Sequence, residues 1–316
     1  MDLRGVGGVW PAALTPFEPS GAIDDGALEA HLKHLAATPG VNAVVVNGHA
    51  GEVTSLDRDE RMHVIETARR VAGLGVGVVT GVIADDTRVA RQLARDAERA
   101  GADAILLFPP ALFALGARLR PEMARAFVGD VAEATGLPIV LFQLTVTSGL
   151  GHTRDTLVAI CKEVPAVIAV KEGSDDPVTY EANLRALRAL SRNVTVLTTN
   201  NAWLLSSLAV GGDGILSGMG SVAADIQADL YRAVKAADVD AARRANDRLF
   251  PLTQAFYRPP LLDMHNRMKT ALHLLGLLRH PTVRRPLLPL PPDEVTLIRA
   301  ALAAAGLERR EAALRG

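Results

Sequence analysis

The chain has 316 residues, 49% of them hydrophobic and 22% charged, which suits one large α/β barrel with an appendage. The 34 Lys and Arg residues nearly balance the 35 Asp and Glu residues, so charge gives no reason to expect nucleic acid or an anionic membrane as a partner. Cys161 is the only cysteine, which excludes an intrachain disulfide and a cysteine-cage metal site.

We expect a soluble, cytoplasmic protein that does not enter a membrane. The first ten residues lack the basic segment and apolar run of a secretory signal. Two uncharged stretches, Ala134–Thr153 and Asn193–Gly212, approach the length of a membrane span. Both are interrupted by glycine and polar residues, so buried strands with flanking loops explain them better.

Short β-branched runs alternate with longer helical patterns along most of the chain. The predicted strands are Val9–Leu14, Val41–Asn47, Val76–Thr80, Ala104–Phe108, Ile139–Phe142, Val167–Val170, Val194–Thr198 and Gly214–Ser217. Their continuous apolar character is typical of parallel strands that are covered on both faces. Helical patterns between them include Asp25–Ala37, Asp57–Val71, Asp85–Ala100, Pro121–Thr135 and Asp176–Leu190. We expect Asp57 and Thr153 to cap helices at the start, and Gly101 and Gly136 to close them.

Eight such alternations predict a (β/α)8 TIM barrel. An open doubly wound sheet is the rival, but no Gly-x-Gly-x-x-Gly motif follows the first strand. The strands stop near Asp238, and Ala241–Phe256, Leu261–Leu278 and Pro292–Ala305 read as helices. We therefore predict a barrel over residues 1–237 that carries the site and a C-terminal helical subdomain over residues 238–316.

Catalytic groups of such barrels lie at the carboxyl ends of the strands, and Lys171 stands at that place after the apolar run Val167–Val170. A lysine withdrawn from water has a lowered pKa and becomes a nucleophilic amine, which condenses with a ketone to an iminium. The alternative is a lysine without catalytic function, which pairs with Glu172 or extends its ammonium to solvent. From its position alone, this alternative is slightly favoured.

The loop Gly48-His49-Ala50-Gly51-Glu52 follows the second strand. Its glycines allow backbone N–H groups to approach an anion such as a carboxylate, although tight turns also use glycine for geometry alone. His49 is either a general acid or base or a loop histidine that binds backbone. We interpret Asn200 and Asn201 as helix-capping residues. His152, His265 and His273 show no ligand spacing, and no metal site is indicated.

With these motifs in order, the chain resembles the dihydrodipicolinate synthase/N-acetylneuraminate lyase family of (β/α)8 Schiff-base lyases that act on pyruvate or other 2-oxo acids. The resemblance runs from residue 7 to the end. The matching segments are Ala12–Phe17, Gly48-x-x-Gly51-Glu52 with Ser55-Leu56 and Glu60-Arg61, Ala169–Ser174, Gly211–Ser217, Lys269–Leu272 with Gly276, and Arg285–Leu287.

The resemblance implies that Lys171 forms the imine and that Gly48–Gly51 hold the carboxylate of the 2-oxo acid. The substrate-binding residues expected from it are Gly48, Ala50, Gly51, Phe142, Gln143 and Ile215, with Lys171 and His49 as catalytic residues. It also implies a homotetramer, and a covalent lysine imine in place of any bound cofactor.

Several positions depart from the family's pattern. Two hydroxyl residues become His49 and Ala50, the relay tyrosine of strand five becomes Phe142, and its neighbouring asparagine and proline become Gln143 and Thr145. The arginine that grips the second substrate aligns with Thr147, and the tyrosine pair after strand four aligns with Pro110 and Ala111.

Phenylalanine keeps the ring and loses the proton-carrying hydroxyl, so we expect neither a standard dihydrodipicolinate synthase nor a standard sialic acid lyase. A divergent Schiff-base aldolase or lyase is the favoured reading, in which His49 or water replaces the tyrosine. A 2-keto-3-deoxy acid dehydratase and a non-catalytic paralogue that binds a 2-oxo acid are the alternatives.

Overall fold

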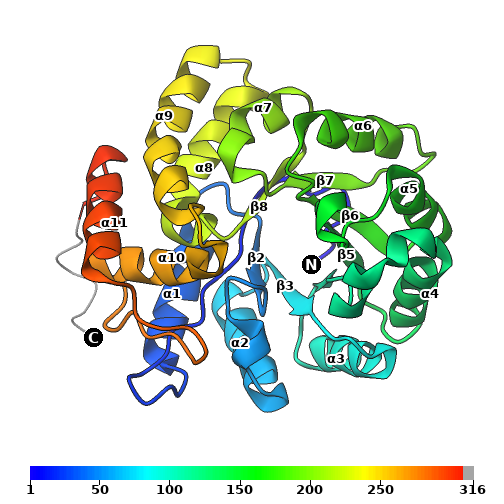
Figure 1. The fold of residues 1–316 in the computed structure, drawn as a ribbon, viewed down its shortest axis with the longest axis horizontal. Helices are drawn as coiled ribbons and strands as arrows, with labels where there is room; N and C mark the ends of the chain where they lie inside the picture. The colour runs from blue at the N-terminus through cyan, green and yellow to red at the C-terminus, as the bar shows by residue number, and fades with distance from the viewer. Residues whose placement is uncertain (309–316) are drawn as a thin grey trace.

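Eight parallel strands form the centre of the molecule in the computed structural model, which describes residues 1–308. The strands are β1 (Gly8–Pro11), β2 (Ala43–Val46), β3 (Gly77–Val82), β4 (Ala104–Leu107), β5 (Ile139–Gln143), β6 (Val167–Glu172), β7 (Thr195–Thr198) and β8 (Gly214–Ser217). Each pairs with its neighbour in chain order, and β1 pairs with β8. Parallel bridges from Val9 to Val41 and from Ala12 to Val45 join β1 to β2, so the sheet nearly closes into a barrel (Figure 1). The predicted TIM barrel is confirmed.

The helices form a ring outside the strands. They are α1 (Asp25–Ala37), α2 (Arg58–Ala72), α3 (Thr87–Arg99), α4 (Pro121–Ala132), α5 (Arg154–Glu163), α6 (Pro177–Arg188), α7 (Leu204–Ala209) and α8 (Gly220–Lys235). Every strand residue is buried, because the barrel interior covers one face of each strand and the helices cover the other. This double burial is the reason for the continuous apolar runs in the sequence.

The ends of these helices follow the expected chemistry with one exception. Asp57 and Glu60 form a reciprocal capping box at the start of α2, and Thr153 caps α5 through the backbone N–H of Thr156. Gly101 adopts φ +89° just after α3, a conformation that favours glycine. Gly136 does not close α4, which ends at Ala132; its N–H instead donates to the Glu98 carboxylate.

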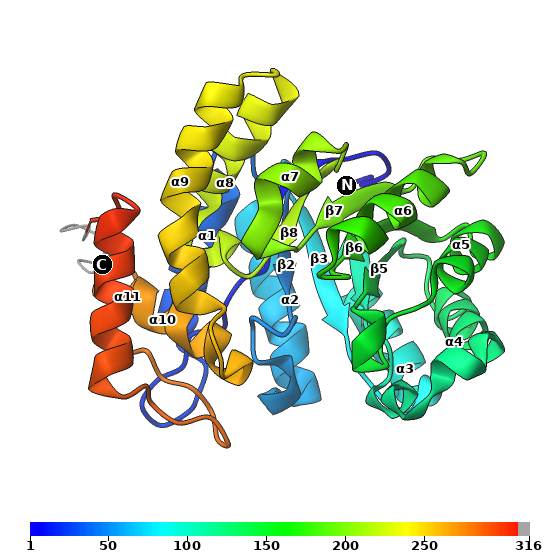
Figure 2. The ribbon, with the colours of Figure 1, turned by 45° about the horizontal axis from the view of Figure 1, so that its top comes forward.

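Three helices follow the barrel on one side of it, where both views show them in yellow to red (Figures 1 and 2). They are α9 (Val239–Phe256), α10 (Met264–Leu274) and α11 (Pro292–Ala304). Helix α9 packs on α8, and α11 packs on α9 and α10. The helical part is therefore confirmed, whereas the domain boundary near residue 238 stays a prediction and residues 309–316 lie outside the described residues.

The predicted helix Leu261–Leu278 is shorter than expected. Leu261–Asp263 form a separate 3-10 turn after Pro260, and α10 covers only Met264–Leu274. The helix ends because Gly276 enters the left-handed region at φ +74°, which turns the chain back on the last carbonyl groups.

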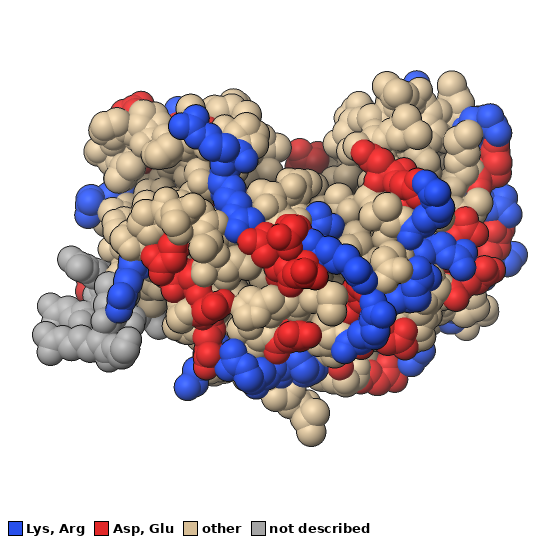
Figure 3. Space-filling view, turned by 90° about the horizontal axis from the view of Figure 1, so that it is seen from below, with Lys and Arg blue, Asp and Glu red and all other residues tan. Residues whose placement is uncertain are grey.

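No helix within residues 1–308 is long and apolar enough to cross a membrane. Basic and acidic side chains lie interspersed on the face that Figure 3 shows, as expected from the near-zero net charge.

Candidate active site

Lys171 lies near the carboxyl end of β6 and is only 8% exposed. Strand β6 pairs Lys171 with Phe142 of β5, and the Lys171 Nζ atom lies 4.1 Å from the centre of the Phe142 ring. Burial lowers the pKa of Lys171 to about 7, because the charged ammonium loses water. Within residues 1–308 the amine makes no ion pair, so no counter-charge opposes this fall in its pKa.

Glu172 is not the partner of Lys171. Successive side chains of a strand point to opposite faces, and the Glu172 carboxylate accepts hydrogen bonds from Ser174, Asn183 and Asn200. Burial raises the pKa of Glu172, while these hydrogen bonds oppose the rise. The alternative of a Lys171–Glu172 pair is thereby removed.

Asn200 has a different role from the expected helix cap. Its amide group donates to the backbone carbonyl and to the carboxylate of Glu172, and its Oδ1 atom accepts from the N–H of Asp175. No side-chain cap is present at the turn Asn201–Trp203. Asn200 therefore ties the end of β7 to the segment that follows Lys171.

The loop after β2 forms a tight turn that offers two backbone donors. The N–H groups of Gly51 and Glu52 donate to the carbonyls of Gly48 and His49, which leaves the N–H groups of His49 and Ala50 without an acceptor among the described residues. N–H groups at the start of a turn are typical ligands of a carboxylate. A Cβ atom on Gly51 would lie 3.0 Å from Thr15 Oγ1, so the turn is packed tightly from behind.

Gly81 of β3 also shapes this loop, although the sequence analysis did not single it out. A Cβ atom there would lie 2.0 Å from the Asn47 carbonyl oxygen, which no relaxation of a side chain relieves. Glycine is therefore required at this point for β3 to pass beneath the loop.

His49 belongs to a cluster of three rings beside the amine. Its ring centre lies 4.7 Å from that of Phe108 and 6.3 Å from that of Phe142, and the two phenylalanines are 5.1 Å apart. His49 is an exposed residue, and one side of its ring lies against these two phenylalanines. Desolvation and then the charge of Lys171 lower the pKa of His49 to about 4, so the imidazole is neutral at pH 7.

The remaining expected substrate-binding residues differ in what they contact. Phe142 lies against Lys171, and Ile215 is fully buried within β8. Gln143 is fully buried as well, but its amide binds both the carbonyl and the N–H of His152. Gln143 therefore holds the loop after β5, and its contact with substrate stays a prediction.

Helix α10 is fastened to the loop that carries His49. Glu52 accepts a hydrogen bond from the ammonium of Lys269 and another, 3.0 Å long, from the backbone N–H of Arg284. Both side chains of the Glu52–Lys269 pair are buried. Desolvation lowers the pKa of Lys269 to about 8, although the carboxylate of Glu52 opposes the shift. The glutamate of the matched motif is therefore a structural anchor.

Two residues near the amine were missed or set aside by the sequence analysis. Phe108 is the last residue of a predicted strand, and its place there was the signal that it faces the barrel mouth. His265 begins α10 and reaches the segment after β8. The only sequence feature that pointed to His265 was its spacing of four residues from Lys269, which puts the two side chains on one face of a helix.

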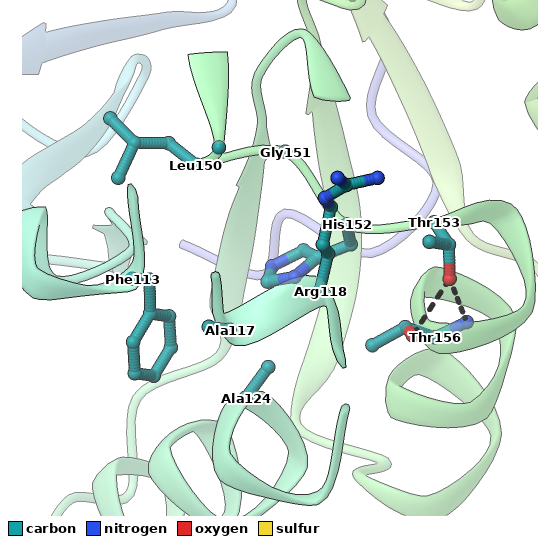
Figure 4. Close-up of a pocket in the computed structure, with 10 residues that line it drawn as sticks. Phe113, Ala117, Arg118, Ala124, Leu150, Gly151, His152, Thr153 and Thr156 are labelled. Atoms are coloured by element: carbon teal, nitrogen blue, oxygen red, sulfur yellow. Dashed lines mark hydrogen bonds between the residues drawn. The ribbon is translucent and has the colours of Figure 1, made fainter. Parts of the chain in front are cut away.

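A separate small pocket is lined by the loop after β5 and by the segment after β4 (Figure 4). Its lining residues include Phe113, Arg118 and His152. The hydroxyl groups of two further lining residues, Thr153 and Thr156, are hydrogen-bonded to each other. Neither Lys171 nor His49 lines it. Within the described residues no group of three or more His, Cys, Asp or Glu is placed to hold a metal ion, and the expectation of no metal stays a prediction.

The fold and the site define the class of the protein: a (β/α)8 barrel with a buried amine near the carboxyl end of its sixth strand. The model of the dihydrodipicolinate synthetase family matches residues 5–305, and the chain belongs to this family of lyases and synthases. The chain is 34% identical over 308 residues to a 4-hydroxy-tetrahydrodipicolinate synthase of Kineococcus radiotolerans, covering 97% of this chain and 96% of the relative.

Solved structures agree on the fold. A monomeric dihydrodipicolinate synthase variant superposes with a TM-score of 0.89 at 24% identity, over 97% of this chain and 99% of the other. A prophage protein of the same family from E. coli K12, solved in complex with pyruvate, superposes with a TM-score of 0.87 at 22% identity, over 95% and 99%.

Proposed function

We propose that the chain is a Schiff-base aldolase or lyase in which Lys171 forms an imine with pyruvate or another 2-oxo acid. The observation that carries this proposal is the Lys171 amine, buried and unpaired within residues 1–308, with its pKa lowered to about 7. An amine in this state is both nucleophilic and able to be protonated near neutral pH. The pyruvate complex of the E. coli protein is consistent with such a substrate.

The parts of the site fit the successive needs of imine formation. The N–H groups of His49 and Ala50 hold the carboxylate of the 2-oxo acid, which presents its ketone to Lys171. The neutral amine adds to the ketone carbon to give a carbinolamine, which takes up one proton and loses one water molecule to give an iminium ion. The iminium then draws electrons from the adjacent carbon, which allows a C–C or C–O bond there to form or break.

We further propose that the reaction differs from that of a standard dihydrodipicolinate synthase, even though the relative from Kineococcus radiotolerans carries that name. The ring next to Lys171 is Phe142, which has no hydroxyl to carry a proton. Thr147 stands where a residue that binds a second carboxylate is expected, and its hydroxyl is hydrogen-bonded to that of Thr145. The neutral His49 imidazole, whose ring lies beside Phe142, takes over the role of the missing proton carrier.

Reductive trapping tests the imine. The protein is incubated with pyruvate and borohydride, digested, and examined by mass spectrometry for one reduced pyruvate on the Lys171 peptide. Lys171→Met should abolish the adduct and keep the fold, because methionine retains most of the apolar stem. Lys162→Met, which alters an exposed lysine of α5, is the matched control and should leave the adduct unchanged. An unmodified Lys171 peptide in the saturated wild-type protein would contradict the proposal.

A turnover assay, combined with the trapping experiment, separates the remaining alternatives. A panel of aldehydes and of 2-keto-3-deoxy acids, scored by product mass, distinguishes an aldolase from a dehydratase. An adduct on Lys171 without turnover of any of these compounds would favour the non-catalytic paralogue.

A further inference from the structure

Helix α10 spans the gap between two loops at the barrel mouth. At one point, Lys269 binds Glu52, three residues beyond His49 in the loop after β2. One turn earlier, His265 lies against the segment after β8, where its Nε2 atom is 3.3 Å from the position that a Cβ atom on Gly218 would take. The ion pair therefore fixes a second imidazole over the same mouth as Lys171 and His49.

The ring of His265 is partly buried, and within residues 1–308 no hydrogen bond joins its nitrogens to another protein group. The charged and titratable groups that act on it are His49 from the β2 loop, Lys171 from β6, and Lys269 from its own helix. Desolvation is the largest cause of its lowered pKa of about 3, and these three groups add to it. On the same helix, His273 by contrast uses its Nδ1 atom on the Leu278 carbonyl.

We propose that His265 is a second acid–base residue of the active site, which exchanges protons with the substrate bound at Lys171. This inference rests on the proposed imine and adds a residue that comes from the C-terminal helices. Neutral imidazole accepts a proton at one nitrogen and carries a proton on the other, so two such rings replace what one phenol does in relatives.

The iminium of pyruvate loses a proton from its methyl carbon to His265, and the C–H electron pair forms the C=C bond of a neutral enamine. The positive charge passes to the imidazolium. In the reverse direction, the enamine carbon takes the proton back and the iminium is restored. In D₂O the same cycle replaces the methyl hydrogens of pyruvate by deuterium, and no second substrate is needed.

Deuterium exchange into pyruvate, followed by proton NMR, therefore tests the inference. His265→Gln should slow exchange by about 10²-fold, at the lower end of what a positioned acid–base group contributes. Borohydride trapping at Lys171 should persist in this variant, because glutamine retains a hydrogen-bonding group of similar size. His49→Gln provides the comparison within the β2 loop, and His273→Gln, on the exposed part of the same helix, is the matched control and should exchange like wild type.

The outcomes separate the two proposals. Wild-type exchange rates in His265→Gln, with trapping intact, would overturn the role of His265 and leave the imine untouched. Failure of the wild-type protein to be trapped would overturn both proposals. If His265→Gln melts well below wild type, His265→Asn takes its place, and normal exchange in that folded variant counts equally against the inference.

Discussion

Lys171 owes its reactivity to the residues that precede it. Val167–Val170 form a strand that is buried on both faces, and this strand carries the lysine into the barrel with no carboxylate beside it among the described residues. The pKa of Lys171 is about 7 in the folded chain against the ordinary 10.5. Between these two pH values the unfolded chain binds a proton that the folded chain does not. Burial of this amine therefore lowers the free energy of unfolding, and the loss reaches its full size below about pH 7.

Removal of the amine should therefore stabilise the protein in a pH-dependent way. We expect Lys171→Met to be more stable than wild type at pH 7, and the difference to shrink by up to about 1.4 kcal/mol per pH unit as the pH rises toward 10. Urea unfolding of both proteins at pH 7, 8 and 9 measures this trend. A difference that stays constant over the range would mean that Lys171 titrates at its ordinary pKa.

Sequence reasoning located Lys171 and His49 because each stands next to a strand end. It set His265 aside because the histidines show no ligand spacing; the placement of its helix depends on the contact between Lys269 and Glu52, which are 217 residues apart in sequence. It read Asn200 as a cap because asparagine commonly has that role, and only the neighbouring strand shows that Glu172 is its partner.

At the level of elements, the β2 loop and the C-terminal helices hold each other in place. The Glu52 carboxylate joins Lys269 of α10 to the backbone of Arg284, and the Arg284 side chain then pairs with Glu60 of α2. The phenyl ring of Phe17 lies 4.0 Å from the Lys269 ammonium and 4.4 Å from the Arg284 guanidinium. Such a buried pair holds the loop in one conformation at the cost of desolvation.

Breaking this pair on one side should destabilise the protein strongly. Glu52→Gln leaves the Lys269 ammonium buried without its counter-charge and should lower the free energy of unfolding by about 3–5 kcal/mol. Glu60→Gln, which removes the more exposed partner of Arg284, should cost at most about 1 kcal/mol. Chemical denaturation of the two variants makes the comparison. Equal losses would show that the Glu52–Lys269 pair is not the anchor.

The strands and most helices were predictable because burial on both faces imposes apolar runs and because caps mark helix starts. The ends of the helices were less predictable. The continuous apolar pattern from Leu261 to Leu278 concealed both the 3-10 turn and the left-handed turn at Gly276, which are set by local backbone geometry.

At the scale of the whole molecule, the homotetramer stays a prediction. The 3-10 turns after β4 leave Leu112, Leu115 and Leu119 exposed at 62%, 85% and 76%, so this short segment offers apolar side chains that a partner subunit would cover. One solved relative is a monomeric variant, so membership of the family does not fix the assembly. We expect sedimentation at micromolar concentration to give the mass of four chains. A monomer under these conditions would contradict the prediction.

A crystal soaked with pyruvate tests the central claim most directly, because it shows the covalent bond and the carboxylate site at once. The account predicts continuous density from the Lys171 Nζ atom to the second carbon of pyruvate, with the pyruvate carboxylate on the N–H groups of His49 and Ala50. Pyruvate bound without a bond to Lys171, or attached to another lysine, would contradict it.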